Sequence, residues 1–207
     1  MTATPTPRLL PGRASAEEVA RVVCEAFVDY PVMRYVLGEQ GDYPARLRTL
    51  IGFFHGARVL RDDAIFGIID GQELVGVALC SLPDRLAPPA LEQLRERTWA
   101  ELGADARARY DTCVRAWEPV GVAKPNVHVN MLAVPPRYQG RGLGRALLER
   151  VHAMSRERGD SRGVTLTTES ERNVALYRHL GYEVVGQRTI APGIETWGLW
   201  RPDYTGP

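Results

Sequence analysis

The sequence predicts a single α/β (α+β) domain, and three observations support this fold class. The apolar alternation of residues 127–134 indicates a buried strand, which two prolines and a glycine-rich turn connect to a helical pattern reaching about Arg158. Strand-like and helix-like segments alternate elsewhere without an internal repeat or a dividing linker. The 207 residues, 44% hydrophobic and 25% charged, suit one well-formed core.

Composition and charge exclude several classes of protein. The net charge of +1 gives no electrostatic case for nucleic acid or a membrane surface as a partner. No apolar run approaches the roughly 18–20 residues of a membrane span, and residues 1–8 lack a signal-peptide core. Cys24, Cys80 and Cys113 show no CxxC spacing, which argues against a disulfide framework or a zinc site. We therefore expect a cytoplasmic protein without a metal, and the preference for arginine over lysine indicates a GC-rich bacterial genome.

The first third of the chain predicts a short strand and a series of helices. Residues 1–6 are rich in Thr and Pro and are expected to be disordered, and Arg8–Pro11 is a candidate strand. Ser15 and Glu18 have the spacing of a capping box in front of an apolar helical stripe. An aromatic-rich turn and short helix follow over 26–36, and a further helix is expected over Pro44–Leu60.

A hairpin and a helical insertion occupy the middle of the chain. Asp70-Gly71 separates the strand candidates Ala64–Ile69 and Glu73–Ser81, and this dipeptide suits a tight turn that needs positive φ angles. Residues 88–118 are helical by pattern, with a break near Gly103.

The last third predicts strands around one short helix. Val164–Thr168 resembles a buried strand, and Arg172–Leu180 is a short helix ended by glycine. Strands are expected over Tyr182–Ile190 and Glu195–Trp200, with Pro192-Gly193 as the turn between them.

The glycines after the central strand predict a site for a phosphate-bearing cofactor. Glycine lets the backbone approach a ligand closely, and the free N–H groups of a helix start bind anions. The spacing excludes a dinucleotide fingerprint, because the sixth position from Gly140 is Arg145. It also excludes a P-loop, since the chain's only lysine, Lys124, precedes the strand.

Two motifs in the second half resemble those of the GCN5-related N-acetyltransferase (GNAT) family. They are Gln139-x-x-Gly142-x-Gly144 after a strand ending Leu-Ala-Val, and Asn173-Val-Ala-Leu-Tyr177-x3-Gly181-Tyr182. The resemblance covers residues 127–185. It implies one acetyltransferase domain over residues 1–207. The implied fold is a mixed, mostly antiparallel central sheet of six to seven strands flanked by helices, splayed between the fourth and fifth strands.

A weaker resemblance covers nearly the whole chain. Ala26-Phe-x-Asp-Tyr-Pro-x-x-Arg34, the insertion 88–118 and Pro192-Gly-x-x-Thr196-Trp197 are similar to the puromycin N-acetyltransferase group, which acetylates small-molecule amines.

The family resemblance implies acetyl-CoA as donor and coenzyme A as product. The pantetheine arm would bond to backbone groups of the central strand, and the diphosphate would lie on the amides from Gly140 to Arg145. The cofactor residues implied in this way are Leu132, Ala133, Val134, Arg137, Gln139, Gly140, Arg141, Gly142, Leu143, Gly144, Arg145 and Asn173.

Tyr177 is the leading catalytic candidate. Direct transfer requires protonation of the departing thiolate, and the resemblance implies that the phenol of this helix serves as the general acid. Asn173, one turn earlier, lies on the same face and could bond the pantetheine amide. Many family members instead carry an asparagine seven residues before the tyrosine, where this chain has Ser170.

The base that deprotonates the amine is left open between several residues. His128 has a side chain of suitable pKa and resembles the first histidine of a His-x-His strand in arylalkylamine N-acetyltransferases, although Asn130 replaces the second. Glu169 and Glu118 are the other candidates. A histidine bonded within a strand and a solvated carboxylate are the alternative interpretations.

The acceptor pocket is expected in the first half of the chain and near its end. Aromatic walls with one carboxylate suit an organic cation. The substrate-binding candidates are Asp29, Tyr30, Met33, Phe66, Trp117 and Trp197.

These observations predict acetyl-CoA-dependent N-acetylation of a small-molecule primary amine by direct attack in a ternary complex. No cysteine lies in a motif, which disfavours an acetyl-enzyme. Acetylation of a protein or peptide, and a non-catalytic acyl-CoA-binding module, are the alternatives. A homodimer is compatible with the sequence, which does not define the oligomeric state.

Overall fold

The computed structural model describes residues 5–12, 15–39, 41–83 and 85–203, and its strands form one mixed sheet. The strand order is β1-β2-β3-β4-β5-β7-β6, with β4 and β5 parallel and the other neighbours antiparallel. The strands are β1 (Arg8–Leu9), β2 (Ile65–Asp70), β3 (Glu73–Ser81), β4 (Val127–Ala133), β5 (Gly163–Thr168), β6 (Glu183–Ala191) and β7 (Ile194–Pro202). This arrangement confirms the predicted mixed, mostly antiparallel sheet of six to seven strands.

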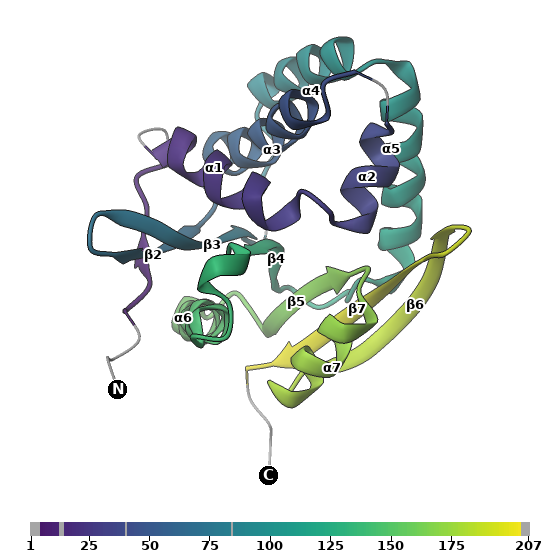
Figure 1. Ribbon diagram of the computed structural model, residues 1–207. Helices are drawn as coiled ribbons and strands as arrows, with labels where there is room; N and C mark the ends of the chain where they lie inside the picture. The colour runs from purple at the N-terminus through teal and green to yellow at the C-terminus, as the bar shows by residue number, and fades with distance from the viewer. Residues whose placement is uncertain (1–4, 13–14, 40, 84, 204–207) are drawn as a thin grey trace.

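Helices cover both faces of the sheet (Figure 1). The helices are α1 (Ala16–Phe27), α2 (Pro31–Leu37), α3 (Tyr43–Leu60), α4 (Pro89–Leu102), α5 (Ala104–Trp117), α6 (Leu143–Arg158) and α7 (Glu171–His179), and the 3-10 turns are η2 (Glu118–Val120) and η3 (Pro136–Tyr138). The first core cluster joins α1, α2, α3 and α5 to one face, and the second joins α6 and α7 to the other. None of the helices described is long and apolar enough to span a membrane.

Two local predictions at the start of the chain need correction or lie partly outside the structure. The Ser15 hydroxyl does not cap α1, because it donates instead to the carbonyl oxygens of Pro11 (3.1 Å) and Gly12 (3.2 Å) in the preceding turn. The predicted capping box is therefore wrong, although the helix begins at the expected place. Residues 1–4 of the expected disordered lead-in lie outside the described residues.

The predicted hairpin is confirmed, with its turn one residue later than expected. Asp70 pairs with Glu73, so the connection consists of Gly71 and Gln72. Gly71 has φ 64°, the conformation that such a turn requires of glycine.

A β-bulge in β4 changes which way its side chains point. Leu79 pairs with Met131 and Cys80 pairs with Val129, so Asn130 is an extra residue in β4. Val127 and Val129 consequently belong to the core with α6, whereas Met131 and Ala133 belong to the core beneath α1–α3. The predicted alternation holds for burial but not for a single face, because it is interrupted at the bulge.

The sheet is splayed beside this bulge. Strands β4 and β5 pair only over Val127–Val129 and Val164–Leu166. Beyond that point β4 continues along β3 and β5 continues along β7. The residues of β4 after the bulge therefore have no partner on their β5 side, which confirms the predicted splay between the fourth and fifth strands.

Two glycines let the end of the helical insertion approach the sheet. Gly186 and Gly198 pair across β6 and β7. A Cβ atom on Gly198 would lie 2.0 Å from the carbonyl oxygen of Val120 in η2, so a side chain there would push η2 away. This close packing fixes the last turn of α5, which carries Trp117.

Candidate active site

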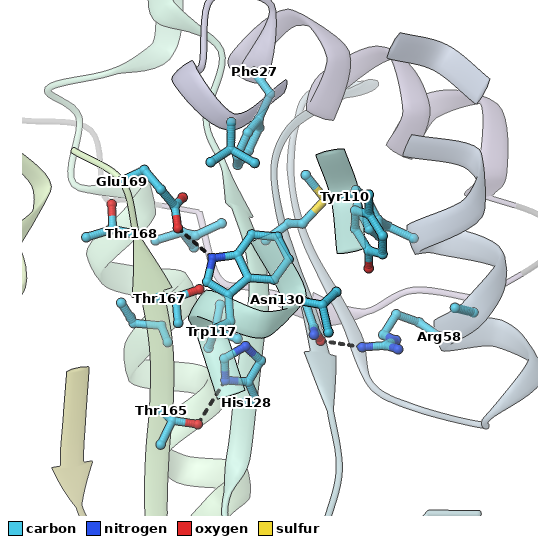
Figure 2. A pocket seen from close by; sticks show the side chains of 18 of the residues that line it. Phe27, Arg58, Tyr110, Trp117, His128, Asn130, Thr165, Thr167, Thr168 and Glu169 are labelled. Carbon is cyan, nitrogen blue, oxygen red and sulfur yellow. Dashed lines mark hydrogen bonds between the residues drawn. The ribbon is translucent and has the colours of Figure 1, made fainter. Parts of the chain in front are cut away.

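A cavity of about 730 Å³ lies where β4 and β5 separate. Its walls come from β4 and β5, from α1–α5 and η2, and from α7. Figure 2 shows that Trp117, His128, Glu169 and Arg58 surround the same space. The site is therefore built by segments that are far apart in the sequence.

The start of α6 has the form of an anion site. Gly140 and Gly142 have φ of 76° and 77°, and Gly142 is the residue that caps α6. A Cβ atom on Gly140 would meet nothing within 4 Å, so the backbone is open on that side. The amides of the first helical turn have no partners within the helix. The residues present thus fit the diphosphate of an acyl-CoA, with the amides of residues 140–145 as donors.

The arginines expected near the phosphates already have carboxylate partners. Arg137 bonds Glu25 and Glu73, the latter at 2.7 Å. Arg141 lies 2.7 Å from Asp70, and Arg145 lies 2.8 Å from Glu149, one turn further along α6. The side chains that fit an anion here are therefore paired, and the backbone is the main source of free donors.

The backbone of β4 after the bulge is available to a ligand on one side. Leu132 and Ala133 pair with Ala78 and Val77 of β3, away from the splay. The Gln139 side chain donates to the carbonyl oxygen of Val134 (3.0 Å), which ties the glycine-rich segment to the end of the strand. Gln139 thus orients the glycine-rich loop, and Leu143, the first residue of α6, is buried in the core that this helix covers.

Tyr177 and Asn173 both line the cavity from α7. Burial raises the pKa of the Tyr177 phenol to about 12, so it is protonated at neutral pH. Asn173 donates to Thr168 Oγ1 at 3.4 Å, which orients its amide along the end of β5. The structure therefore brings the two predicted residues of α7 to the same opening.

Glu169 follows β5 and is held by two donors. Its Oε1 accepts from Trp117 Nε1 (2.9 Å) and from Thr196 Oγ1 (2.7 Å). Its backbone amide donates to the Tyr30 hydroxyl at 2.9 Å. Burial raises the pKa of the Glu169 carboxyl, while these bonds oppose the rise. Neither of the bonds from Trp117 and Thr196 uses the second oxygen, Oε2.

His128 is fixed in one tautomer by a chain of hydrogen bonds. The Asn126 amide nitrogen donates to the carbonyl oxygens of Val122 and Lys124, so its Oδ1 is an acceptor. Thr165 donates to that oxygen at 2.5 Å and must accept from His128 Nδ1 at 2.9 Å. His128 Nε2 is then the unprotonated nitrogen. Burial, with a smaller effect of Arg58, lowers the pKa of His128 to about 4, so the ring is neutral at pH 7.

Three of the six predicted acceptor residues line the cavity. These are Tyr30, Met33 and Trp117. Asp29 does not, because its side chain is 83% exposed and pairs with Arg34 at 2.7 Å. Phe66 is buried in the core with α6, on the other face of the sheet, and Trp197 packs against that core.

Sequence reasoning missed several residues of the cavity wall. Arg58 comes from the last turn of α3 and bonds Ser81 and Asn130, the latter at 2.5 Å. Tyr110 of α5 packs against Trp99 with the rings tilted by 38° and meets Trp117 edge-on, at ring centroid distances of 4.9 and 6.0 Å. Helical periodicity marks all of these positions as ordinary helix residues, so only the bulge at Asn130 and the packing of α5 bring them to the site.

Comparison with known proteins decides the family. A sequence model described as "Acetyltransferase (GNAT) domain" matches residues 89–198, which is more than half of the chain. The chain belongs to the GNAT acetyltransferase family. The match begins at α4, so the helices α1–α3, which also line the cavity, lie outside it.

Individual relatives do not agree on a substrate. Over 60 residues the chain is 38% identical to the N-alpha-acetyltransferase RimI of Mycobacterium tuberculosis, a match covering 29% of this chain and only 37% of that protein. Two solved structures share the fold. One is a histone acetyltransferase HPA2-related protein of Corynebacterium glutamicum (24% identity, 99% of both chains, TM-score 0.71). The other is a polyamine N-acetyltransferase of Drosophila melanogaster (17% identity, 94% of this chain and 97% of that chain, TM-score 0.57).

Proposed function

We propose that this protein transfers an acetyl group from acetyl-CoA to a primary amine of a small molecule, by direct attack in a ternary complex. The observation that carries the proposal is the cavity of about 730 Å³ beside the splayed strands, which has Tyr177, His128 and Glu169 in or along its wall. Its volume is in the range of sites for small ligands, roughly 300–1,000 Å³. Acetyl-CoA, when bound, supplies an activated acetyl group.

The amides at the start of α6 and the free edge of β4 hold the donor in this proposal. Gly140 and Gly142 let the backbone turn toward the diphosphate, and the unpaired side of β4 offers hydrogen bonds to the pantetheine arm. The resemblance of the Gln139-x-x-Gly142-x-Gly144 motif and the family match both support this placement.

His128 and Glu169 prepare the amine. The Glu169 carboxylate attracts the ammonium group, and the neutral His128 ring accepts one of its protons at Nε2, which frees the nitrogen lone pair to attack the thioester carbon. As the C–N bond forms and the C–S bond breaks, Tyr177 donates its proton to the departing sulfur. The remaining extra proton of the nitrogen then restores the phenol. A pKa of about 12 keeps the phenol protonated until that moment.

A protein or peptide acceptor is the second candidate, and the similarity to RimI over 60 residues is the observation in its favour. The aromatic rings of Tyr110 and Trp117, which line the cavity, favour the small amine, because they give an organic amine an apolar surface to pack against.

A thiol-release assay with acetyl-CoA and a broad panel of amines tests the proposal. We expect coenzyme A to be released with at least one small primary amine and the matching N-acetyl product to appear by mass spectrometry. Acetyl-CoA binding without thiol release from any amine would instead favour a binding module. Turnover confined to peptides would favour the second candidate.

A further inference from the structure

The charged residues of the cavity wall are segregated by sign. Three arginines line it, Arg58 and Arg61 from the end of α3 and Arg95 from α4. The lining carboxylates are those of Glu118 and Glu169, and they come from η2 and the end of β5. In the view of Figure 2, Trp117 and His128 lie between Glu169 and Arg58. The cavity thus has one acidic and one basic end.

The basic end carries more positive charge than the chain itself neutralises. Arg58 and Arg61 both contact Oδ2 of Asp63, at 3.2 and 3.1 Å, so two guanidinium groups share one carboxylate. The other oxygen of Asp63 accepts from the backbone amide of Leu82 (2.9 Å). Arg95 is balanced by Glu92 at 2.8 Å. One positive charge is therefore left over beside the cavity.

Arg58 is held rigidly where this charge can be used. Its side chain is only 13% exposed, and it also bonds Ser81 and the bulged Asn130. A guanidinium that is mostly removed from water and only half neutralised is stabilised by an anion that reaches it. Its fixed donors are suited to the two oxygens of a carboxylate or to a phosphate.

Resting on the proposed function, we infer that the acceptor is an amine that also carries an anionic group, a carboxylate or a phosphate, which Arg58 binds at the end of the cavity away from Glu169. Glu169 and His128 then receive the amine, and the aromatic rings of Trp117 and Tyr110 cover the part of the molecule between its two charges. A simple cationic amine would leave the charge at Arg58 uncompensated.

Four matched series of acceptors test this inference with the full-length chain and acetyl-CoA: n-alkylamines, ω-amino carboxylates, ω-aminoalkyl phosphates and α,ω-diamines of equal chain lengths. At one or more lengths, an anionic group should raise kcat/KM about tenfold or more over the alkylamine, the effect of one charge-assisted hydrogen bond. The better of the carboxylate and phosphate series identifies the anion. Equal or faster turnover of alkylamines or diamines at every length would overturn the inference.

Variants locate the effect. Arg58→Gln should lower the ratio of kcat/KM for the anionic acceptor over the alkylamine to about one. Arg97→Gln is the matched control, because Arg97 is exposed on α4 and does not line the cavity. A folded Arg58→Gln protein with an unchanged ratio contradicts the inference.

A second variant covers the case in which Arg58→Gln does not fold. Arg61→Gln leaves Asp63 to Arg58 alone and so removes the surplus charge, and the ratio should again fall. An unchanged ratio would contradict the inference. Thiol release only from amines that lack an anionic group overturns this inference and leaves the acetyltransferase proposal intact, whereas no release from any amine overturns both.

Discussion

The start of α6 and the cavity wall beneath α1–α5 present chemical groups in opposite ways. At α6 the exposed groups are backbone amides set out by Gly140 and Gly142, while the nearby arginines are paired with carboxylates. In the cavity, the groups are side chains from separate elements, such as Trp117, Glu169 and Arg58, held by hydrogen bonds between elements. A backbone site is sensitive to chain conformation, whereas a side-chain site can change its ligand by substitution. The four predictions below test that difference.

Tyr177→Phe should have the largest effect, because Tyr177 lines the cavity from α7 and is the proposed general acid. Loss of the general acid should lower kcat about 10²–10³-fold while leaving acetyl-CoA affinity within about twofold. Steady-state kinetics and calorimetry measure the two quantities. Tyr182→Phe is the matched control, since Tyr182 is buried beside His152 outside the cavity. Near-normal turnover by Tyr177→Phe would contradict the role of Tyr177 as general acid.

Gly140→Ala and Gly159→Ala compare the two ends of the α6 segment. Both glycines have positive φ (76° and 66°), and neither has an atom within 4 Å of an added Cβ. Each alanine should therefore cost a similar stability of about 1 kcal/mol. Only Gly140→Ala should also raise the KM for acetyl-CoA, by about tenfold, because its methyl group occupies the place of the phosphate oxygens. Equal KM values in the two variants would argue against a backbone site.

Thr165→Val should have a smaller effect, confined to the acceptor side. The change removes the hydroxyl that accepts from His128 Nδ1, so the ring is free to change tautomer. We expect kcat/KM for the amine to fall about tenfold with acetyl-CoA affinity retained. In the wild type, turnover should persist until the pH approaches the pKa of His128, about 4, and the acid limb should shift in Thr165→Val. If the wild type and Thr165→Val had identical pH profiles, the hydrogen bond from His128 to Thr165 would have no role in catalysis.

The remaining effect is on stability, and it involves His152 beneath α6. Burial lowers the pKa of His152 to about 3, below its ordinary value of 6.5, so between those values the unfolded chain binds more protons than the folded chain. The free energy of unfolding should therefore decrease as pH falls below 6.5, by about 2 kcal/mol by pH 5 for this residue. Urea denaturation of wild type and His152→Phe measures it. A difference between the two that is independent of pH would contradict this explanation.

The same contrast explains what the sequence could predict. The glycine-rich turn, the strand before it and the motif around Tyr177 are local, so the order of the motifs and the family resemblance that they carry located them. The helix and strand order, the hairpin and the splay are confirmed by the structure for similar reasons.

The cavity wall was harder to predict from the sequence, because its geometry depends on packing between segments that are far apart in the chain. The bulge at Asn130 changes the face of the sheet to which the following side chains of β4 point, and no local pattern in the sequence predicts it. Phe66 and Trp197 are aromatic residues of the expected type, yet they belong to the core of the other face. Arg58 was missed because a single arginine near the end of a helix is ordinarily interpreted as a solvent-exposed residue.

A crystal structure of the protein with coenzyme A tests the central claim most directly. The account predicts diphosphate oxygens within about 3 Å of the amides between Gly140 and Arg145. It also predicts the sulfur between β4 and β5 within reach of the Tyr177 hydroxyl, roughly 3–4 Å away. A diphosphate bound elsewhere, or a Tyr177 hydroxyl directed away from the sulfur, would contradict it.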